Sequence, residues 1–271
     1  MTIDYIKLSP TGNITVLVKT PVPRSQHAAL AAHLLREDCV GGEQVGYIEP
    51  PDDPRAAARL QMMGGEFCGN ATMSLGAVLA REAGLGEGAA MELSMEVSGS
   101  AGLVPCRIQK RGDGWTGAVR MPLPTRVSRF VPATGECPSG VPLVELPGIA
   151  HLILPAEAGI GEARLRQRLP QWMEAIGADA LGALTWDATA RSMDPLVYVP
   201  SAGTLVREHG CGSGSAAIGS WLALQAGHSL TTAIAQPGGV IEVQADVHDG
   251  ALRALSITGH VALLEAGSVQ I

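Results

Sequence analysis

Two cysteines in this sequence stand in matching surroundings that could support proton transfer or nucleophilic attack. Cys211 begins the segment Cys-Gly-Ser-Gly-Ser and is followed by an apolar run over residues 216–226. Cys68 begins Cys-Gly-Asn-Ala-Thr and is followed by a similar run over residues 73–83. Small residues ahead of a helical pattern predict that each thiol lies at a helix N-terminus, beside free backbone N–H groups.

A thiol in that position feels the positive end of the helix dipole, roughly half a unit charge. The dipole lowers a cysteine pKa from about 8.5, to as low as ~3.5 in strong cases. One such site could hold a nucleophile. Two such thiols that face each other around one carbon could act together: one removes a proton from one side, and the other gives a proton to the opposite side. This reaction inverts a stereocentre without a cofactor. Both helix N-termini would then stabilise the substrate carboxylate while the α-carbon is deprotonated.

The two cysteine motifs align without a gap over the whole of the following helix. This alignment indicates two structurally similar halves, each with a helix packed against a sheet. Short strands interspersed with few helices favour an α+β fold over regular βαβ winding. The matched pairs are Cys68–Gly76 with Cys211–Gly219, Leu79-Ala80 with Leu222-Ala223, and Ala83-Gly84 with Ala226-Gly227.

The remaining elements follow from hydrophobic patterns and turn residues. Pro122-Leu123-Pro124-Thr125 predicts a domain boundary, with domains at 1–121 and 122–258 and a separate last strand at 259–269. Helices are predicted over 25–35 and 163–176, where Pro170 should end or kink the second. Residues 56–63 fit a strand or a helical turn. Predicted strands cover 14–18, 44–48, 91–97, 102–109, 115–121, two stretches within 143–154, 182–187, 196–199, and a hairpin of 241–247 with 252–258.

Composition excludes several classes of protein. The 271 residues carry a formal charge of −7 and only three lysines, which argues against nucleic acid, an anionic membrane surface and a pyridoxal Schiff base. No apolar run reaches the ~18 residues of a membrane span, and the N-terminus lacks a secretory pattern. Five scattered cysteines are typical of reduced thiols in the cytoplasm. No CxxC or HxxxH spacing indicates a metal site.

Several of these segments resemble the diaminopimelate epimerase-like family of cofactor-independent racemases and epimerases. The matching segments are Gly12-Asn13, Gln44 ahead of Glu49-Pro50-Pro51, Glu66–Ala71 and Cys211–Gly214. The resemblance implies two pseudo-symmetric domains, each a curled mixed or antiparallel sheet around a central helix, with residues 259–271 returning to the first domain. It also implies that one cysteine is the thiolate base and the other the thiol acid. Family members need no cofactor and are often homodimers.

The sequence departs from diaminopimelate epimerase itself where that enzyme grips the far end of its substrate. Pro200-Ser201-Ala202-Gly203 stands where the enzyme has a Glu-Arg pair, and Gln61-Met62-Met63 stands where it has an asparagine. The spacing of Glu66 and Glu208 to the cysteines is more similar to the histidine racemases of staphylopine-type metallophore synthesis. The resemblance therefore favours a small amino-acid substrate, with histidine ahead of diaminopimelate.

Several of the predicted substrate-binding residues also fit a purely structural role. Glu208 could bind the substrate ammonium group or tune Cys211, or it could merely complement a helix N-terminus; Glu66 has the same alternatives. Asn13 could be an amide of the site or a turn residue, and Gln44 could be an amide of the site or a strand residue. Asn70 could orient the substrate carboxylate or make a hydrogen bond within the first turn of its helix. The full predicted set is Asn13, Gln44, Gly69, Asn70, Glu208, Gly212 and Ser213, with Cys68 and Cys211 catalytic and no metal.

Other functions remain open from the sequence. Cys211 with His209 or His151 could form a hydrolase or transferase, although His209 is expected to face solvent and His151 to lie in the core. The chain could also bind an amino acid without catalysis. Cys68 and Cys211 could be core residues, or could form a disulfide in an oxidised, inactive form.

Overall fold

The computed structural model describes residues 1–200 and 203–271, which form two compact units. Unit 1 contains Met1–Arg120 and Thr258–Ile271, and unit 2 contains Met121–Ile257. Cys68 therefore belongs to unit 1 and Cys211 to unit 2. Ser201 and Ala202, part of the segment that distinguishes the chain from diaminopimelate epimerase, lie outside the described residues.

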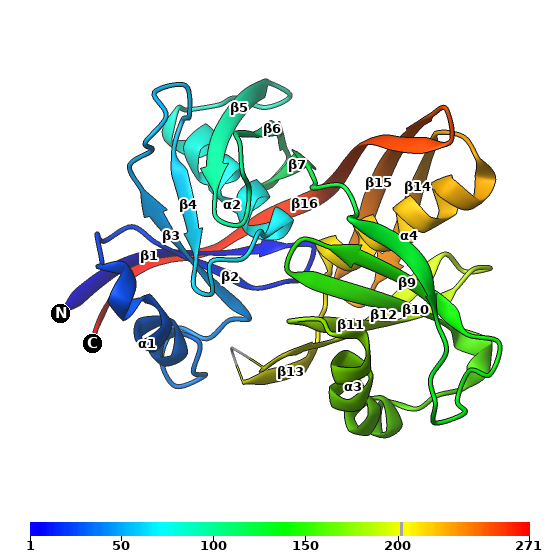
Figure 1. Ribbon diagram of the computed structural model, residues 1–271. Coiled ribbons are helices and arrows are strands. Elements are labelled where there is room, and N and C mark those ends of the chain that lie inside the picture. The colour runs from blue at the N-terminus through cyan, green and yellow to red at the C-terminus, as the bar shows by residue number, and fades with distance from the viewer. Residues whose placement is uncertain (201–202) are drawn as a thin grey trace. The chain divides into compact units, whose positions relative to one another are not determined.

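Unit 1 is a mixed sheet that closes around one helix (Figure 1). Its strands hydrogen-bond in the order β1-β2-β3-β4-β5-β6-β7-β16, and β16 pairs again with β1. The enclosed helix α2 (Gly69–Glu82) packs against β1, β2 and β4–β7 and is buried along most of its length. The strands are β1 (Thr2–Pro10), β2 (Thr15–Val18), β3 (Gln44–Glu49), β4 (Arg59–Met62), β5 (Ala90–Val97), β6 (Val104–Arg111), β7 (Gly114–Arg120) and the C-terminal part of β16 (Ala251–Gln270).

Unit 2 repeats this order of strands and helices. Its sheet runs β16-β15-β14-β12-β11-β10-β9-β8, with β13 paired to β12, and its helix α4 (Gly212–Ala226) packs against β9, β10, β14 and β15. The strands are β8 (Arg126–Phe130), β9 (Val141–Leu146), β10 (Ile149–Pro155), β11 (Leu181–Asp187), β12 (Ser192–Val199), β13 (Thr204–Arg207), β14 (Leu230–Gln236), β15 (Gly239–His248) and the N-terminal part of β16.

The directions of the strands show how closely the units correspond. In unit 1, β2 is parallel to β3 and β4 is parallel to β5, while neighbouring pairs are antiparallel. In unit 2, the parallel pairs are β10 with β11 and β12 with β14. The predicted α+β fold with two pseudo-symmetric halves, each a sheet curled about a central helix, is confirmed.

Each central helix lies close to its sheet because a glycine faces it. A Cβ atom added to Gly76 in α2 would lie 2.7 Å from Cγ1 of Ile108, and one added to Gly219 in α4 would lie 2.4 Å from Cγ1 of Val243. These two glycines are paired in the alignment of the cysteine motifs. Their match therefore reflects a shared need for close helix–sheet contact.

Two further helices cover the outer faces of the sheets. Leu30, Ala31 and Leu34 of α1 (Arg24–Leu34) pack into the apolar cluster of β1–β3, and Leu165, Leu169 and Trp172 of α3 (Glu162–Ile176) pack into that of β9–β12. A short 3₁₀ turn, η1 (Ala156–Ala158), precedes α3. No helix among the described residues is long and apolar enough to cross a membrane.

The structure corrects one predicted boundary between strands and narrows two alternatives that the sequence left open. Pro170 does not end α3, which continues to Ile176 because Leu165, Leu169 and Trp172 anchor turns on both sides of the proline. The predicted strands 252–258 and 259–269 are one strand, β16, in which Gly259 is accommodated. Residues 56–63 contain a strand, β4, and not a helical turn. The patterns did not predict β1, β8, β13 or β14.

Candidate active site

Both cysteines occupy the N-cap position of a central helix. Cys68 caps α2 in an extended conformation, and its Sγ accepts a hydrogen bond from Ala71 N at 3.4 Å. Cys211 caps α4 in an extended conformation, and its Sγ accepts one from Gly214 N at 3.3 Å. A backbone donor three residues along the chain and the helix dipole both favour negative charge on sulfur. The same local structure thus serves each thiol in its own unit.

Cys68 ends a chain of polar side chains in unit 1. Its half-buried thiol donates to Gln44 Oε1 at 3.1 Å, while Gln44 Nε2 donates to Asn13 Oδ1 at 2.6 Å and to Thr15 Oγ1 at 2.7 Å. Asn13 Nδ2 in turn donates to Glu43 Oε2 at 3.1 Å. The register that places Thr15 beside Gln44 on the parallel strands β2 and β3 brings these groups together. Asn13 and Gln44 therefore hold the Cys68 thiol in position.

Cys211 is far more enclosed, with 2% of its surface exposed. Its backbone N–H donates to Gln236 Oε1 at 2.6 Å, and Gln236 Nε2 donates to Ser215 Oγ at 2.9 Å. Gln236 lies at the end of β14 and Ser215 in the first turn of α4, so these bonds fix the entry to the helix. Neither Gln236 nor Ser215 was predicted from the sequence.

Burial and a neighbouring carboxylate keep the Cys211 thiol protonated. Burial raises its pKa well above the ordinary value of 9.0, and Glu208 raises it further through its charge and a side-chain hydrogen bond. The Ser213 hydroxyl, 3.6 Å from Sγ, and the N–H of Gly214 act in the opposite direction and favour the thiolate. Glu208 thus contacts the thiol that it was predicted to tune.

His151 reaches the second cysteine indirectly. Its ring is fully buried on β10, and Nε2 lies 3.0 Å from Ser213 Oγ. Burial alone lowers the pKa of His151 to about 3, so the ring is uncharged at neutral pH. His209, by contrast, is exposed, as predicted. Among the described residues, His151 hydrogen-bonds to Ser213 and not to the sulfur, so it does not form with Cys211 the direct cysteine–histidine pair that a hydrolase uses.

The other predicted residues occupy the first turns of the two helices or the approach to them. Gly69 and Gly212 are buried at the first helical position, and Asn70 is 4% exposed beside Gly69. Glu66 is exposed as a residue, yet its carboxyl group folds back beside Gly64, and desolvation raises the pKa of that carboxyl. Together the residues near each cysteine provide a thiol, a polar side chain on it and a helix N-terminus suited to a carboxylate.

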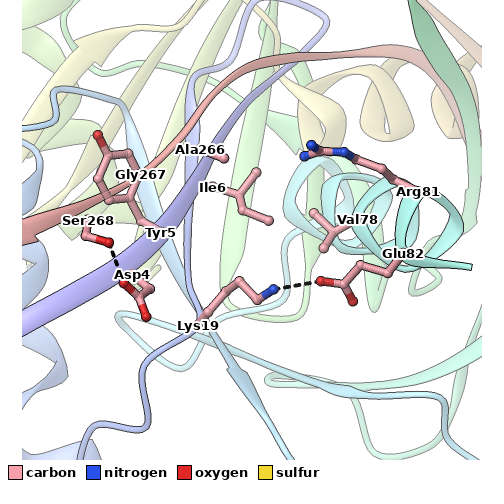
Figure 2. A pocket seen from close by; sticks show the side chains of 10 residues that line it. All are labelled: Asp4, Tyr5, Ile6, Lys19, Val78, Arg81, Glu82, Ala266, Gly267 and Ser268. Atoms are coloured by element: carbon pink, nitrogen blue, oxygen red, sulfur yellow. Dashed lines mark hydrogen bonds and ion pairs between the residues drawn. The ribbon is translucent and has the colours of Figure 1, made fainter.

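A surface pocket on unit 1 contains none of these residues (Figure 2). Three of its four charged side chains have a partner in the pocket: Lys19 donates to Glu82 at 2.7 Å, and Ser268 donates to Asp4 at 2.5 Å. No cysteine or histidine lines it. We therefore place the candidate chemistry at the helix N-termini and not in this pocket.

Solved structures of other proteins share the fold of this chain. A predicted epimerase from Pseudomonas aeruginosa superposes with a TM-score of 0.71 at 16% identity, covering 99% of each chain. A hydroxyproline epimerase from Agrobacterium vitis superposes with a TM-score of 0.68 at 14% identity, covering 99% of this chain and 92% of that one. The fold is therefore that of racemase- and epimerase-like proteins with two matching halves.

Sequence comparison identifies the family within that class. The family model described as the histidine racemase CntK N-terminal domain matches residues 2–270. A histidine racemase from Staphylococcus aureus (strain Mu50) is 31% identical over 99% of this chain and 98% of its own length. A histidine racemase from Fusobacterium nucleatum is 27% identical over 99% and 97%. The chain belongs to this histidine racemase family, which confirms the resemblance inferred from the cysteine motifs.

Proposed function

We propose that this chain is a cofactor-independent histidine racemase in which Cys68 and Cys211 are the two acid–base groups. The observation that carries the proposal is the repeated N-cap: each sulfur accepts a backbone N–H at the start of a central helix, in units of matching topology. Family membership makes the chain an amino-acid racemase, an isomerase, and its curated relatives are histidine racemases.

In the proposed reaction, the thiolate of one cysteine removes the α-proton of histidine from one face. The thiol of the other cysteine then gives its proton to the opposite face, so the configuration at Cα is inverted and the two sulfurs exchange protonation states. The reverse direction uses the cysteines in the opposite roles. The mechanism requires the two helix N-termini to approach the same Cα from opposite sides.

The remaining predicted residues support this chemistry. In this proposal the N–H groups in the first turns of α2 and α4 bind the α-carboxylate and stabilise the charge that develops on deprotonation. Gln44 orients Cys68 and also reaches Asn13. Glu208 acts on Cys211 and offers a carboxylate to the substrate ammonium group.

The test is racemisation of L-histidine by the purified protein without added cofactor, measured as the loss of optical rotation. We expect Cys68→Ala and Cys211→Ala each to reduce kcat/KM by about 10²- to 10⁴-fold, the range for loss of an acid–base group. Cys39→Ala is the matched control, since Cys39 is half-buried as Cys68 is but caps neither central helix. Full activity in both motif variants would refute the proposal.

The same assay separates the alternatives. Racemisation of diaminopimelate but not of histidine would assign the chain to the epimerase. A trapped acyl group on Cys211, with Cys68 dispensable, would indicate a hydrolase or transferase. Binding of histidine without exchange of its α-proton would indicate a binding protein.

Four finer expectations accompany the proposal. We expect a homodimer in the cytoplasm that does not bind nucleic acid and whose product is used in metallophore synthesis. The acidic charge of −7 supports the expectation about nucleic acid. Light scattering of the purified protein tests the dimer, and cell fractionation tests the compartment.

A further inference from the structure

The fully buried His151 has no role in the reaction described above, yet it contacts the site of Cys211. Its Nε2 lies 3.0 Å from Ser213 Oγ, and Ser213 Oγ lies 3.6 Å from Cys211 Sγ. The three groups come from two parts of unit 2: His151 from β10, and Ser213 and Cys211 from the first turn of α4 and its cap. They form a continuous polar path that ends at the sulfur.

The structure reserves space for the ring in this position. A Cβ atom added to Gly182 on the neighbouring strand β11 would lie 2.2 Å from His151 Nδ1. His151 and Gly182 are directly registered partners on the parallel strands β10 and β11. Any side chain larger than that of glycine at residue 182 would displace the ring from Ser213. The glycine at residue 182 therefore allows the His151 ring to occupy its position next to Ser213.

The hydrogen-bond partners of the ring indicate its tautomer. Nδ1 is buried and has no hydrogen-bond partner among the described residues. A buried N–H without an acceptor is rarer in proteins than a buried acceptor without a donor. The proton therefore belongs on Nε2, which then donates to Ser213 Oγ. Ser213 has a single hydroxyl proton, and with its oxygen already accepting from His151 that proton is directed to Cys211 Sγ.

We propose that His151 and Ser213 are a positioning pair that stabilises the Cys211 thiolate: His151 Nε2–H holds the Ser213 hydroxyl so that it donates to the sulfur. His151 never takes up the substrate proton, because the ring does not contact the sulfur and stays uncharged. The pair opposes Glu208, an ionisable group that acts on this thiol and favours its protonated form. The buried cysteine thereby remains able to act as a base.

A parallel arrangement in unit 1 supports this role. There the parallel pair β2 and β3 provides the polar group for Cys68, through Thr15 and the registered Gln44. In unit 2 the corresponding pair, β10 and β11, provides His151, whose ring hydrogen-bonds to Ser213 and acts on the sulfur through that hydroxyl. Each cysteine thus has a polar contact that depends on the corresponding parallel pair of strands in its own sheet.

The test measures how fast iodoacetamide alkylates Cys211 as a function of pH, with the modified cysteine identified by peptide mass spectrometry. We expect Ser213→Ala to raise the apparent pKa of Cys211 by about one unit, the equivalent of one hydrogen bond to a charged group. Ser213→Thr, which keeps the hydroxyl, should restore the profile. Cys68 in the same molecules is the internal reference and should not change.

Two substitutions at His151 test the remote member of the pair. His151→Leu removes the donor at similar volume and should shift the Cys211 profile in the direction of Ser213→Ala. His151→Gln offers an amide donor in place of Nε2–H and should restore much of it. Circular dichroism shows whether each His151 variant is folded. If a His151 variant is misfolded, the result for folded Ser213→Ala decides. An unchanged Cys211 profile in Ser213→Ala would overturn the proposal.

Turnover gives a second readout. The proposed function supplies the purpose of the pair, and we expect kcat/KM for histidine to fall about tenfold in Ser213→Ala, equally for both enantiomers because the equilibrium constant of a racemisation is one. Alkylation does not depend on the substrate. If the wild-type protein failed to racemise histidine, the proposed function would fail while the alkylation profile still decided the role of His151 and Ser213.

Discussion

The two cysteine sites share a backbone but differ in the groups around the sulfur. Cys68 is half-buried and its thiol donates to the neutral amide of Gln44. Cys211 is buried, with the Glu208 carboxylate on one side and Ser213 on the other. Matching topology therefore fixes the position of each thiol, while nearby side chains set its protonation. A two-base enzyme needs one thiolate and one thiol, and this difference favours Cys211 as the thiol in the resting protein.

The largest effect of this difference should be on chemical reactivity. At pH 7.5 we expect iodoacetamide to modify Cys68 at least about tenfold faster than Cys211, because Cys211 is enclosed and burial raises its pKa. Peptide mass spectrometry over time measures both rates in one sample. Equal rates, or faster modification of Cys211, would contradict the comparison.

Removing the charge of Glu208 should reduce the difference between the sites. Glu208→Gln keeps the size of the side chain but removes the carboxylate that raises the pKa of Cys211, so that pKa should fall. Alkylation of Cys211 should then begin at lower pH, whereas that of Cys68 should not change. Asp194→Asn is a suitable control, since Asp194 lies in unit 2 and pairs with Arg207 on the surface. If the alkylation profile of Cys211 moved to higher pH, Glu208 would not raise the pKa of this thiol, and the prediction would be wrong.

Disrupting the amide chain should affect the other site alone. Gln44→Ala removes the acceptor for the Cys68 thiol and the donor to Asn13 and Thr15, so kcat/KM for histidine should fall about tenfold. Gln61→Ala, on the neighbouring strand β4, is the control. Steady-state kinetics in both directions measures the effect. If Gln44→Ala had the kinetics of the wild type, Gln44 would have no role in the reaction.

The smallest expected effect is on stability in acid. The pKa of His151 is lowered to about 3 by burial, from 6.5 in the unfolded chain. The unfolded state therefore binds a proton more readily, and the stabilising contribution that is fully present above pH 6.5 is lost as pH falls toward 3. Urea unfolding at pH 7 and pH 5 should show a smaller decrease for His151→Gln than for wild type. The exposed His248→Gln should behave as wild type.

The sequence was sufficient to predict the features that depend on local patterns. Both helix-capping cysteines and the duplication follow from small residues ahead of an apolar run, and the paired glycines Gly76 and Gly219 were visible in the alignment. Family resemblance then supplied the reaction class, which the comparisons confirm. The catalytic assignment of the cysteines stays a prediction until the variants are measured.

Contacts between distant segments could not be predicted in this way. Glu43, Thr15 and Gln236 reach the sites through strand register, and the link from His151 to Ser213 spans 62 positions in the sequence. Pro170 does not end α3, because tertiary packing of the helix outweighs the lost backbone hydrogen bond. The single strand β16 was divided at Gly259 because a glycine inside a strand has the same local pattern as a turn.

The most direct test of the two-base reaction is isotope incorporation from deuterated water during the initial turnover of L-histidine. Because one cysteine removes the proton and the other supplies a solvent-derived one, we predict that the D-histidine formed carries deuterium at Cα while the remaining L-histidine does not. Proton nuclear magnetic resonance, after separation of the enantiomers, measures both. D-histidine that retains the original proton would show that one group removes and returns it, and would contradict the account.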